Sequence, residues 1–146
     1  MLTAGIDYFN DQVKSTESFL ETSRRNWGLF AQHQAAIAAH NLQSSLRWDH
    51  NEQFGKWVTG GIGWGYAITP NLRLTANFGN AFKAPTFNEL YFPFSGNPSL
   101  KPESSRSFEM GITSTTKLGK WSVNAYETHI SNLITFDIQT FSSINV

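Results

Sequence analysis

Hydrophobic and polar residues alternate at every second position over most of the chain, which is the period of a β-strand rather than of a helix. We predict seven strands. Five of them alternate clearly, and their apolar sets are Leu2, Ala4, Ile6 and Tyr8; Leu42, Leu46 and Trp48; Val58, Ile62, Trp64 and Tyr66; Leu72, Leu74, Ala76 and Phe78; and Phe108, Met110 and Ile112.

Two further strands alternate less regularly. The segment 27–37 keeps its period only if His33 shares the apolar face with Leu29, Ala31 and Ala35. The segment 121–134 changes phase near Ala125, where we expect a bulge.

The connections between these strands alternate between long and short. Segments 14–25, 50–56 and 80–107 are medium to very long, whereas 38–41, 69–71 and 118–120 are short. Transmembrane β-barrels have this asymmetry, with tight turns on one side of the membrane, long loops on the other, and aromatic girdles at both interfaces. Aromatic residues lie near the long connections (Tyr8, Trp27, Trp48, Phe78, Phe108) and near the short ones (Trp64, Tyr66, Trp121). We therefore predict an all-β antiparallel meander that forms part of a transmembrane β-barrel.

The second face of the predicted sheet is polar or small, and we expect it to face the barrel lumen. Seven strands do not close an even-numbered barrel, although an eighth strand after Ile138 would complete the smallest type. Small residues on the inner face suit a wide barrel better than a narrow one packed with side chains. We therefore expect a contiguous internal portion, about a third, of a larger barrel. The expected lumen-facing residues are Arg47, Asp49, Arg73, Asn77 and Glu109, beside a glycine row at 61, 63 and 65.

The composition excludes several other classes of protein. Net charge is zero and charged residues make up 15% of the chain, so nothing indicates nucleic-acid binding. No run approaches the roughly 20 apolar residues of a membrane helix. The chain has no cysteine, which excludes a disulfide scaffold and a thiolate metal site. Its N-terminus carries no export signal, so we expect an internal piece of a longer protein.

The segment 77–103 combines aromatic residues and prolines in one long loop. It contains FKAPT at 82–86, NELY at 88–91 and GNPSLKPE at 96–103. These pieces closely resemble the extracellular-loop signature of TonB-dependent outer-membrane receptors. The strand VNAYETHISNLITF at 123–136 is similar to the strand that follows the next short turn in that family.

This resemblance implies TonB-driven import across the outer membrane of a Gram-negative bacterium, through a 22-stranded barrel that holds an internal plug. The chain contains no recognisable plug, TonB box or closing strand. The complete receptor would therefore contact its plug and TonB through segments outside this chain. The other partners are outer-membrane lipid and a small-molecule ligand, with no cofactor. KAP at 83–85, Asn97-Pro98, Glu103 and SNLI at 131–134 favour the vitamin B12 (cobalamin) branch, with a ferric-chelate siderophore receptor as the alternative.

The long loop holds the best candidates for ligand binding. We predict that Phe92 and Phe94 contact ligand at the loop tip, with Lys83 and Asn97 as orienting polar groups. Phe82, Leu90 and Tyr91 are expected to form the loop framework.

Other chemistries have weaker support. The four histidines lack paired metal-ligand spacing, and 49–52 lacks the spacing of a calcium loop, so we expect no metal site. The glycines 61, 63 and 65 precede no helix and are expected to allow close packing rather than to bind phosphate. No catalytic triad or carboxylate pair is specified, so the chain is not expected to be an enzyme. A passive porin-like barrel and a water-soluble all-β binding module remain as alternatives.

Overall fold

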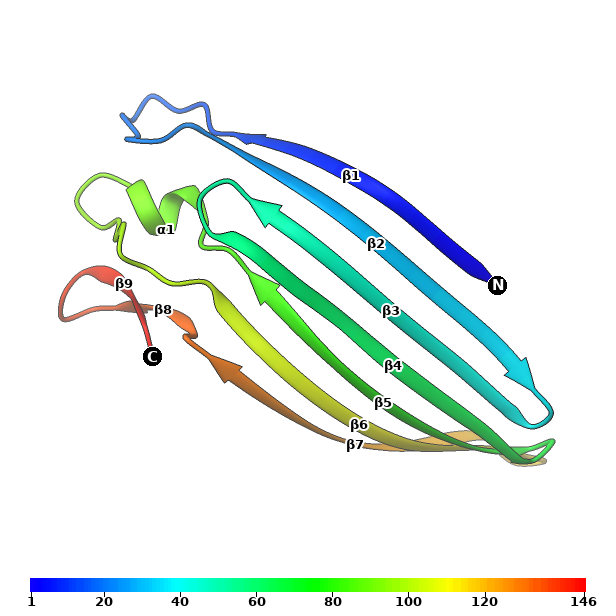
Figure 1. Cartoon of the computed structure of the whole chain (residues 1–146). Helices are drawn as coiled ribbons and strands as arrows, with labels where there is room; N and C mark the ends of the chain where they lie inside the picture. Colours follow the sequence, from blue (N-terminus) through cyan, green and yellow to red (C-terminus); the bar gives the residue numbers. More distant parts are fainter.

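The structure is a computed structural model that describes residues 1–146 and contains one seven-stranded antiparallel meander. The strands lie side by side in sequence order and form a curved wall (Figure 1). Seven predicted strands are thereby confirmed. Their bounds are β1 Leu2–Gln12, β2 Ser23–Ile37, β3 His40–Asn51, β4 Gly55–Thr69, β5 Leu72–Lys83, β6 Glu103–Thr116 and β7 Gly119–Ser131.

Long and short connections lie at opposite ends of the wall, as predicted. Segments 13–22, 52–54 and 84–102 join strands at one end, and two-residue turns join them at the other. The longest loop is shorter than the predicted 80–107, because the β5–β6 ladder continues as far as the pair Lys83 and Glu103. Polar residues fill this part of β6 from Glu103 to Ser107, and Asn80 interrupts the apolar series of β5, so hydrophobic alternation does not reveal it.

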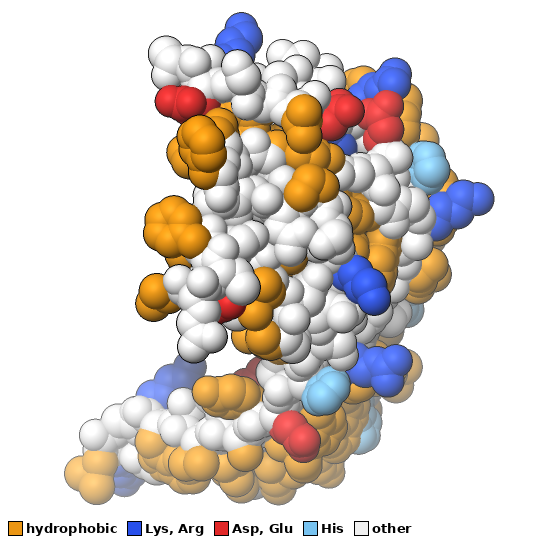
Figure 2. Space-filling model, turned by 90° about the vertical axis from the view of Figure 1, so that its left-hand side faces the viewer, with side chains coloured by type: hydrophobic (Ala, Val, Ile, Leu, Met, Phe, Trp, Pro, Cys, Tyr) orange, Lys and Arg blue, Asp and Glu red, His pale blue; other side chains and the backbone are white.

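The strand register separates two faces. On the apolar face, Leu29 stands opposite Ile6 and Trp48, and Leu74 stands opposite Tyr66 and Ile112. Figure 2 shows hydrophobic side chains along the convex side of the curved wall. These side chains remain uncovered; Ile6, for example, is 71% exposed. The sheet therefore has no core of its own, and its apolar face requires a non-aqueous neighbour.

The register confirms one of the two expectations for the less regular strands and contradicts the other. His33 does lie on the apolar face, opposite Leu2 and Ser44. The expected bulge near Ala125 is wrong, because β7 pairs with β6 without interruption from Gly119 to Ser131. The phase change instead reflects Tyr126, which lies on the polar face opposite Glu109.

The C-terminal residues form a separate small sheet rather than an eighth strand of the wall. Strand β8, Ile134–Asp137, pairs with β9, Ser142–Asn145, as an antiparallel hairpin. Figure 1 shows this hairpin at the long-loop end of the wall, near the single helix α1, Phe87–Tyr91. No helix of the structure is long and apolar enough to cross a membrane.

Candidate functional site

The long loop, residues 84–102, begins with a capped helical turn. Thr86 is the N-cap of α1, and its hydroxyl accepts a hydrogen bond from the Glu89 amide at 3.2 Å. The Glu89 carboxylate in turn accepts from the Thr86 amide at 2.7 Å. This reciprocal pair is a capping box, which satisfies amides that have no partner inside the helix. A helix of five residues is therefore held at a fixed place on the loop.

The main buried cluster of the molecule lies beneath this loop. Leu90 has no exposed surface, Pro85 is fully buried, and Phe87 and Leu100 are also buried. Outside the loop, at the end of β5, the Phe82 ring stacks on Trp57 of β4 with 4.3 Å between centroids. The long loop thus has its own hydrophobic core and holds its shape through packing. Leu90 has the framework role predicted for it, whereas Phe82 lies in β5, opposite Ser104, and outside the loop. The Tyr91 hydroxyl accepts a hydrogen bond from the Gln53 side chain at 2.5 Å, which ties α1 to the turn 52–54.

Arg24, on the polar face at the beginning of β2, anchors the loop to the wall. Its guanidinium donates to the carbonyl oxygen of Pro85 at 2.8 Å and lies over the Phe87 ring, 5.1 Å from the centroid. A more distant carboxylate, Asp11, is 4.0 Å away. Arg24 is buried, and its Nε atom has no hydrogen-bond partner. Nothing local in the sequence marks Arg24, because the Pro85 carbonyl that it binds is 61 positions away in the chain.

The hairpin β8–β9 fastens the other side of the loop. The Asn97 side chain donates to the carbonyl oxygen of Ser143 at 2.8 Å. The Asn145 side chain accepts from the Lys101 amide at 2.8 Å and donates to the Lys101 carbonyl at 2.9 Å. Loop and hairpin are therefore tied together through side-chain amides.

The four predicted ligand-binding residues fall into two groups. The Lys83 ammonium lies 3.1 Å from the Glu103 carboxylate and 3.8 Å from that of Glu89, and Asn97 is bonded to the hairpin. Phe92 and Phe94, by contrast, are exposed. The Phe94 side chain is fully exposed and its backbone adopts φ +69°, a conformation that non-glycine residues rarely take. The Phe92 ring is 41% exposed and meets the Phe19 ring edge-on, with 6.2 Å between centroids, so Phe94 is the free ring at the loop tip. Lys83 and Asn97 already have partners within the protein.

The five predicted lumen-facing residues share the polar face, and two of them form a charged network. Arg47 contacts the carboxylates of Asp7 at 2.6 Å and Asp49 at 2.8 Å, and Asn26 donates to Asp49 at 3.0 Å. This network joins β1, β2 and β3. The Arg47 guanidinium lies across Gly28, in the space that a Cβ atom at that position would occupy.

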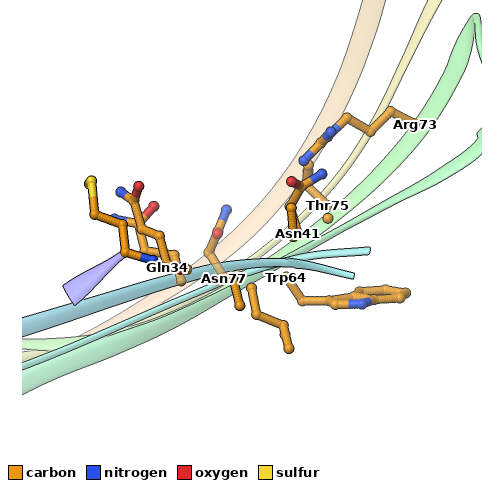
Figure 3. A pocket seen from close by; sticks show the side chains of 13 residues that line it. Gln34, Asn41, Trp64, Arg73, Thr75 and Asn77 are labelled. Carbon is orange, nitrogen blue, oxygen red and sulfur yellow. Dashed lines mark hydrogen bonds between the residues drawn. The ribbon is translucent and has the colours of Figure 1, made fainter. Parts of the chain in front are cut away.

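A depression of about 590 Å³ lies on the polar face, towards the end of the wall that carries the short turns. Figure 3 shows Gln34, Asn41, Asn77 and Arg73 on one side of the sheet, with the Trp64 ring on the other. Arg73 lies across Gly65, and the Asn77 side chain lies across Gly63. The close packing expected for the glycine row is thus confirmed at these positions. Glu109 stands between Asn77 and Tyr126 in the ladder.

Two ends of the apolar face carry aromatic clusters. At the long-loop end, Tyr8 and Trp27 lie 4.5 Å apart between ring centroids. At the short-turn end, His40 stacks on Tyr66 at 4.7 Å and accepts a hydrogen bond from the Trp64 indole at 3.1 Å. These pairs form parts of the two predicted girdles, and His40 belongs to the second one rather than to a turn.

The turn 52–54 carries the strongest electrostatic perturbation outside the strands. Hydrogen bonds from the Arg25 side chain and backbone lower the pKa of Glu52 to about 2. The Arg25 guanidinium lies 2.6 Å from this carboxylate. The turn is thus bound to the start of β2 across a wide range of pH. No three His, Asp or Glu side chains come close enough to hold a metal ion.

A curved meander with an uncovered apolar face, aromatic clusters at both ends and long loops at one end is the wall of a transmembrane β-barrel. The family model described as "TonB dependent receptor-like, beta-barrel" matches residues 2–146. The chain belongs to this family, whose members are transporters of the Gram-negative outer membrane rather than enzymes.

Curated relatives agree with this assignment. The chain is 37% identical to the vitamin B12 transporter BtuB of Photobacterium profundum over 134 residues, which cover 91% of this chain and 22% of the relative. It is 33% identical to the vitamin B12 transporter BtuB of Vibrio cholerae, covering 97% of this chain and 23% of the relative. The chain therefore spans less than a quarter of the length of these relatives.

Solved structures share the fold. The siderophore receptor PirA from Pseudomonas aeruginosa has a TM-score of 0.84 at 18% identity, covering 99% of this chain and 30% of that chain. The copper transporter OprC has a TM-score of 0.77 at 17% identity, covering 99% of this chain and 30% of that chain.

Proposed function

We propose that this chain is a wall segment of a TonB-dependent importer for vitamin B12, and that its long loop takes part in recognising the corrinoid. Identity of 33 to 37% to vitamin B12 transporters over nearly the whole chain supports the branch. The observation that carries the recognition role is the tip of the long loop, where Phe92 and Phe94 are exposed on a loop that has its own buried core.

In this proposal the wall is part of a 22-stranded barrel. Its apolar face contacts outer-membrane lipid, and its long loops lie outside the cell. The polar face lines the lumen, where Arg47, Asp49, Arg73, Asn77 and Glu109 face the protein's own plug. The plug and TonB, which drives release of the ligand, are contacted through other parts of the complete receptor.

The contacts with ligand are divided between direct and supporting residues. Phe92 and Phe94 offer ring faces to the apolar edges of a large ligand, as rings in binding sites commonly do. Lys83 and Asn97 act indirectly, since Lys83 is ion-paired to Glu103 and Asn97 holds the hairpin. They fix the loop rather than donate freely to a bound molecule.

A siderophore receptor is the second candidate. The observation in its favour is the fold shared with the siderophore receptor PirA, which extends over 99% of this chain. At 18% identity this likeness concerns the fold alone.

Uptake by whole cells tests the proposal. The complete receptor is expressed in a Gram-negative host that lacks its own vitamin B12 and catecholate transporters, and uptake of labelled cyanocobalamin and of a labelled ferric catecholate is measured. We expect cyanocobalamin uptake that disappears when TonB is deleted. Uptake of the ferric chelate alone would favour the second candidate, and uptake that persists without TonB would indicate a passive pore.

A further inference from the structure

A row of polar side chains crosses the apolar face beyond its aromatic residues, at the long-loop end. Asn80, Arg106 and His129 are successive cross-strand neighbours on β5, β6 and β7. Two residues deeper on β5 and β6, Phe78 stands opposite Phe108. Because residues two apart in a strand share a face, this polar row directs its side chains to the same side as the rings. All three side chains are exposed.

The charge in this row is uncompensated. Arg106 forms no ion pair, whereas Arg24, Arg25 and Arg47 each contact a carboxylate. The one carboxylate on the apolar face of β4 to β7 is Glu127, which stands opposite Phe108 and makes no ion pair with Arg106 or His129. A cation that has no partner within the protein is free to bind an external anion.

A notch opens beside this row, because β4 and β5 stop pairing beyond Gly60 and Asn80. The Asn80 side chain bridges the opening: it accepts from the Gly60 amide at 2.8 Å and donates to the Val58 carbonyl at 3.1 Å. The notch has a volume of about 360 Å³. Its free donors are the side chains of Arg106, His129, Ser104 and Ser131, and its rings are Trp57 and Phe82.

We infer that this notch binds the phosphate group of a phosphorylated glycolipid in the outer leaflet of the membrane. A guanidinium beside hydroxyl donors suits a phosphate, because charge-assisted hydrogen bonds to its oxygens are short and strong. The location suits a lipid headgroup, because the notch lies just beyond a ring of aromatic residues, the level at which headgroups meet a barrel. Below it, Phe78, Phe108 and Met110 offer an apolar surface to the acyl chains. The inference rests on the proposed orientation, with the long loops outside the cell.

Native mass spectrometry of the complete receptor tests this site. The receptor, purified in mild detergent, is titrated with lipid A that carries its phosphates and with dephosphorylated lipid A. We expect tighter binding of the phosphorylated form. The double variant Arg106→Gln/His129→Gln should reduce that binding roughly tenfold, which corresponds to about 1.4 kcal/mol. The control Lys117→Gln/Lys120→Gln, at the short-turn end, should leave it unchanged.

Neutralising the nearby carboxylate of Glu127 should have the opposite effect on lipid binding. Glu127→Gln should strengthen binding of phosphorylated lipid A, because the carboxylate repels the phosphate. Equal binding of both lipid forms by the unaltered receptor would overturn the inference without any variant. Equal losses in the double variant and in the control would overturn it too. Cyanocobalamin uptake, measured in parallel, separates a failure of this site from a failure of the proposed function.

Discussion

Arg24 donates a hydrogen bond of 2.8 Å to the carbonyl oxygen of Pro85, which joins the beginning of β2 to the long loop after β5. The same guanidinium lies over the Phe87 ring, and the whole side chain is buried. One residue on the wall therefore holds both the start of the loop and the first residue of α1.

Arg24→Met keeps the length of the side chain and removes its charge and donors. We expect the free energy of loop opening to fall by about 1.5 to 3 kcal/mol, because the Pro85 carbonyl loses a charge-assisted partner in a buried place. Hydrogen exchange of the Leu90 and Asn97 amides in the complete receptor measures this change. Lys101→Met, which alters a cation outside any ion pair, is the control and should leave the exchange rates unchanged.

The register of β5 predicts opposite tolerances at two neighbouring positions. Leu74 lies on the apolar face between Tyr66 and Ile112, whereas Thr75 borders the depression on the polar face. We expect Leu74→Arg to destabilise the barrel by about 2 to 4 kcal/mol, because it places a charge in lipid. Thr75→Arg should cost much less. Folding titrations of both variants measure the two penalties, and similar values would contradict the assignment of the faces.

Hydrophobic alternation predicts the seven strands because, over the middle of every strand, one face of the wall is apolar and the other is polar or small. It did not predict the strand ends, where residues such as Asn80, Ser104 and Arg24 are polar whichever way they point. The helix α1 has a local sequence signal, the spacing of Thr86 and Glu89 in a capping box, but its five residues are too few to show a helical period. The bonds from Asn97 to Ser143 and from Arg24 to Pro85 had none, since they join segments far apart in the chain.

The loop tip provides a test of ligand contact. We expect Phe92→Ala combined with Phe94→Ala to weaken cyanocobalamin binding by about 2 kcal/mol or more, the usual cost of truncating an anchoring ring. Assembly should stay normal because Phe94 is fully exposed and Phe92 lies outside the buried cluster of the loop. Leu90→Ala should instead loosen the loop by about 2 to 5 kcal/mol, because it empties the buried cluster. Binding titrations normalised to the amount of folded receptor separate these effects, and unchanged affinity in the double variant would remove both rings from the site.

The contact between Arg25 and Glu52 predicts a pH dependence. The folded pKa of Glu52, about 2, lies below the ordinary value of 4.5. A depressed carboxyl pKa means that the contact contributes its full stability above about pH 4.5 and loses it as the pH falls through about 2. Carbon NMR of labelled Glu52 should show its titration near pH 2. Arg25→Gln should return the titration to the ordinary range, and an unshifted pKa in the unaltered receptor would disprove the contact.

Accessibility of single cysteines tests the account most directly, in a complete receptor in which any cysteine outside this chain is replaced by serine; the chain itself contains none. Ser95→Cys places a thiol beside Phe94 at the loop tip, and Leu118→Cys places one in the exposed turn between β6 and β7. Intact cells that make the complete receptor are treated with a membrane-impermeant maleimide, with and without cyanocobalamin. We expect Ser95→Cys to react, cyanocobalamin to slow that reaction severalfold, and Leu118→Cys to react only after the outer membrane is opened. Reaction of Leu118→Cys in intact cells, or a Ser95→Cys rate that cyanocobalamin does not change, would contradict the account.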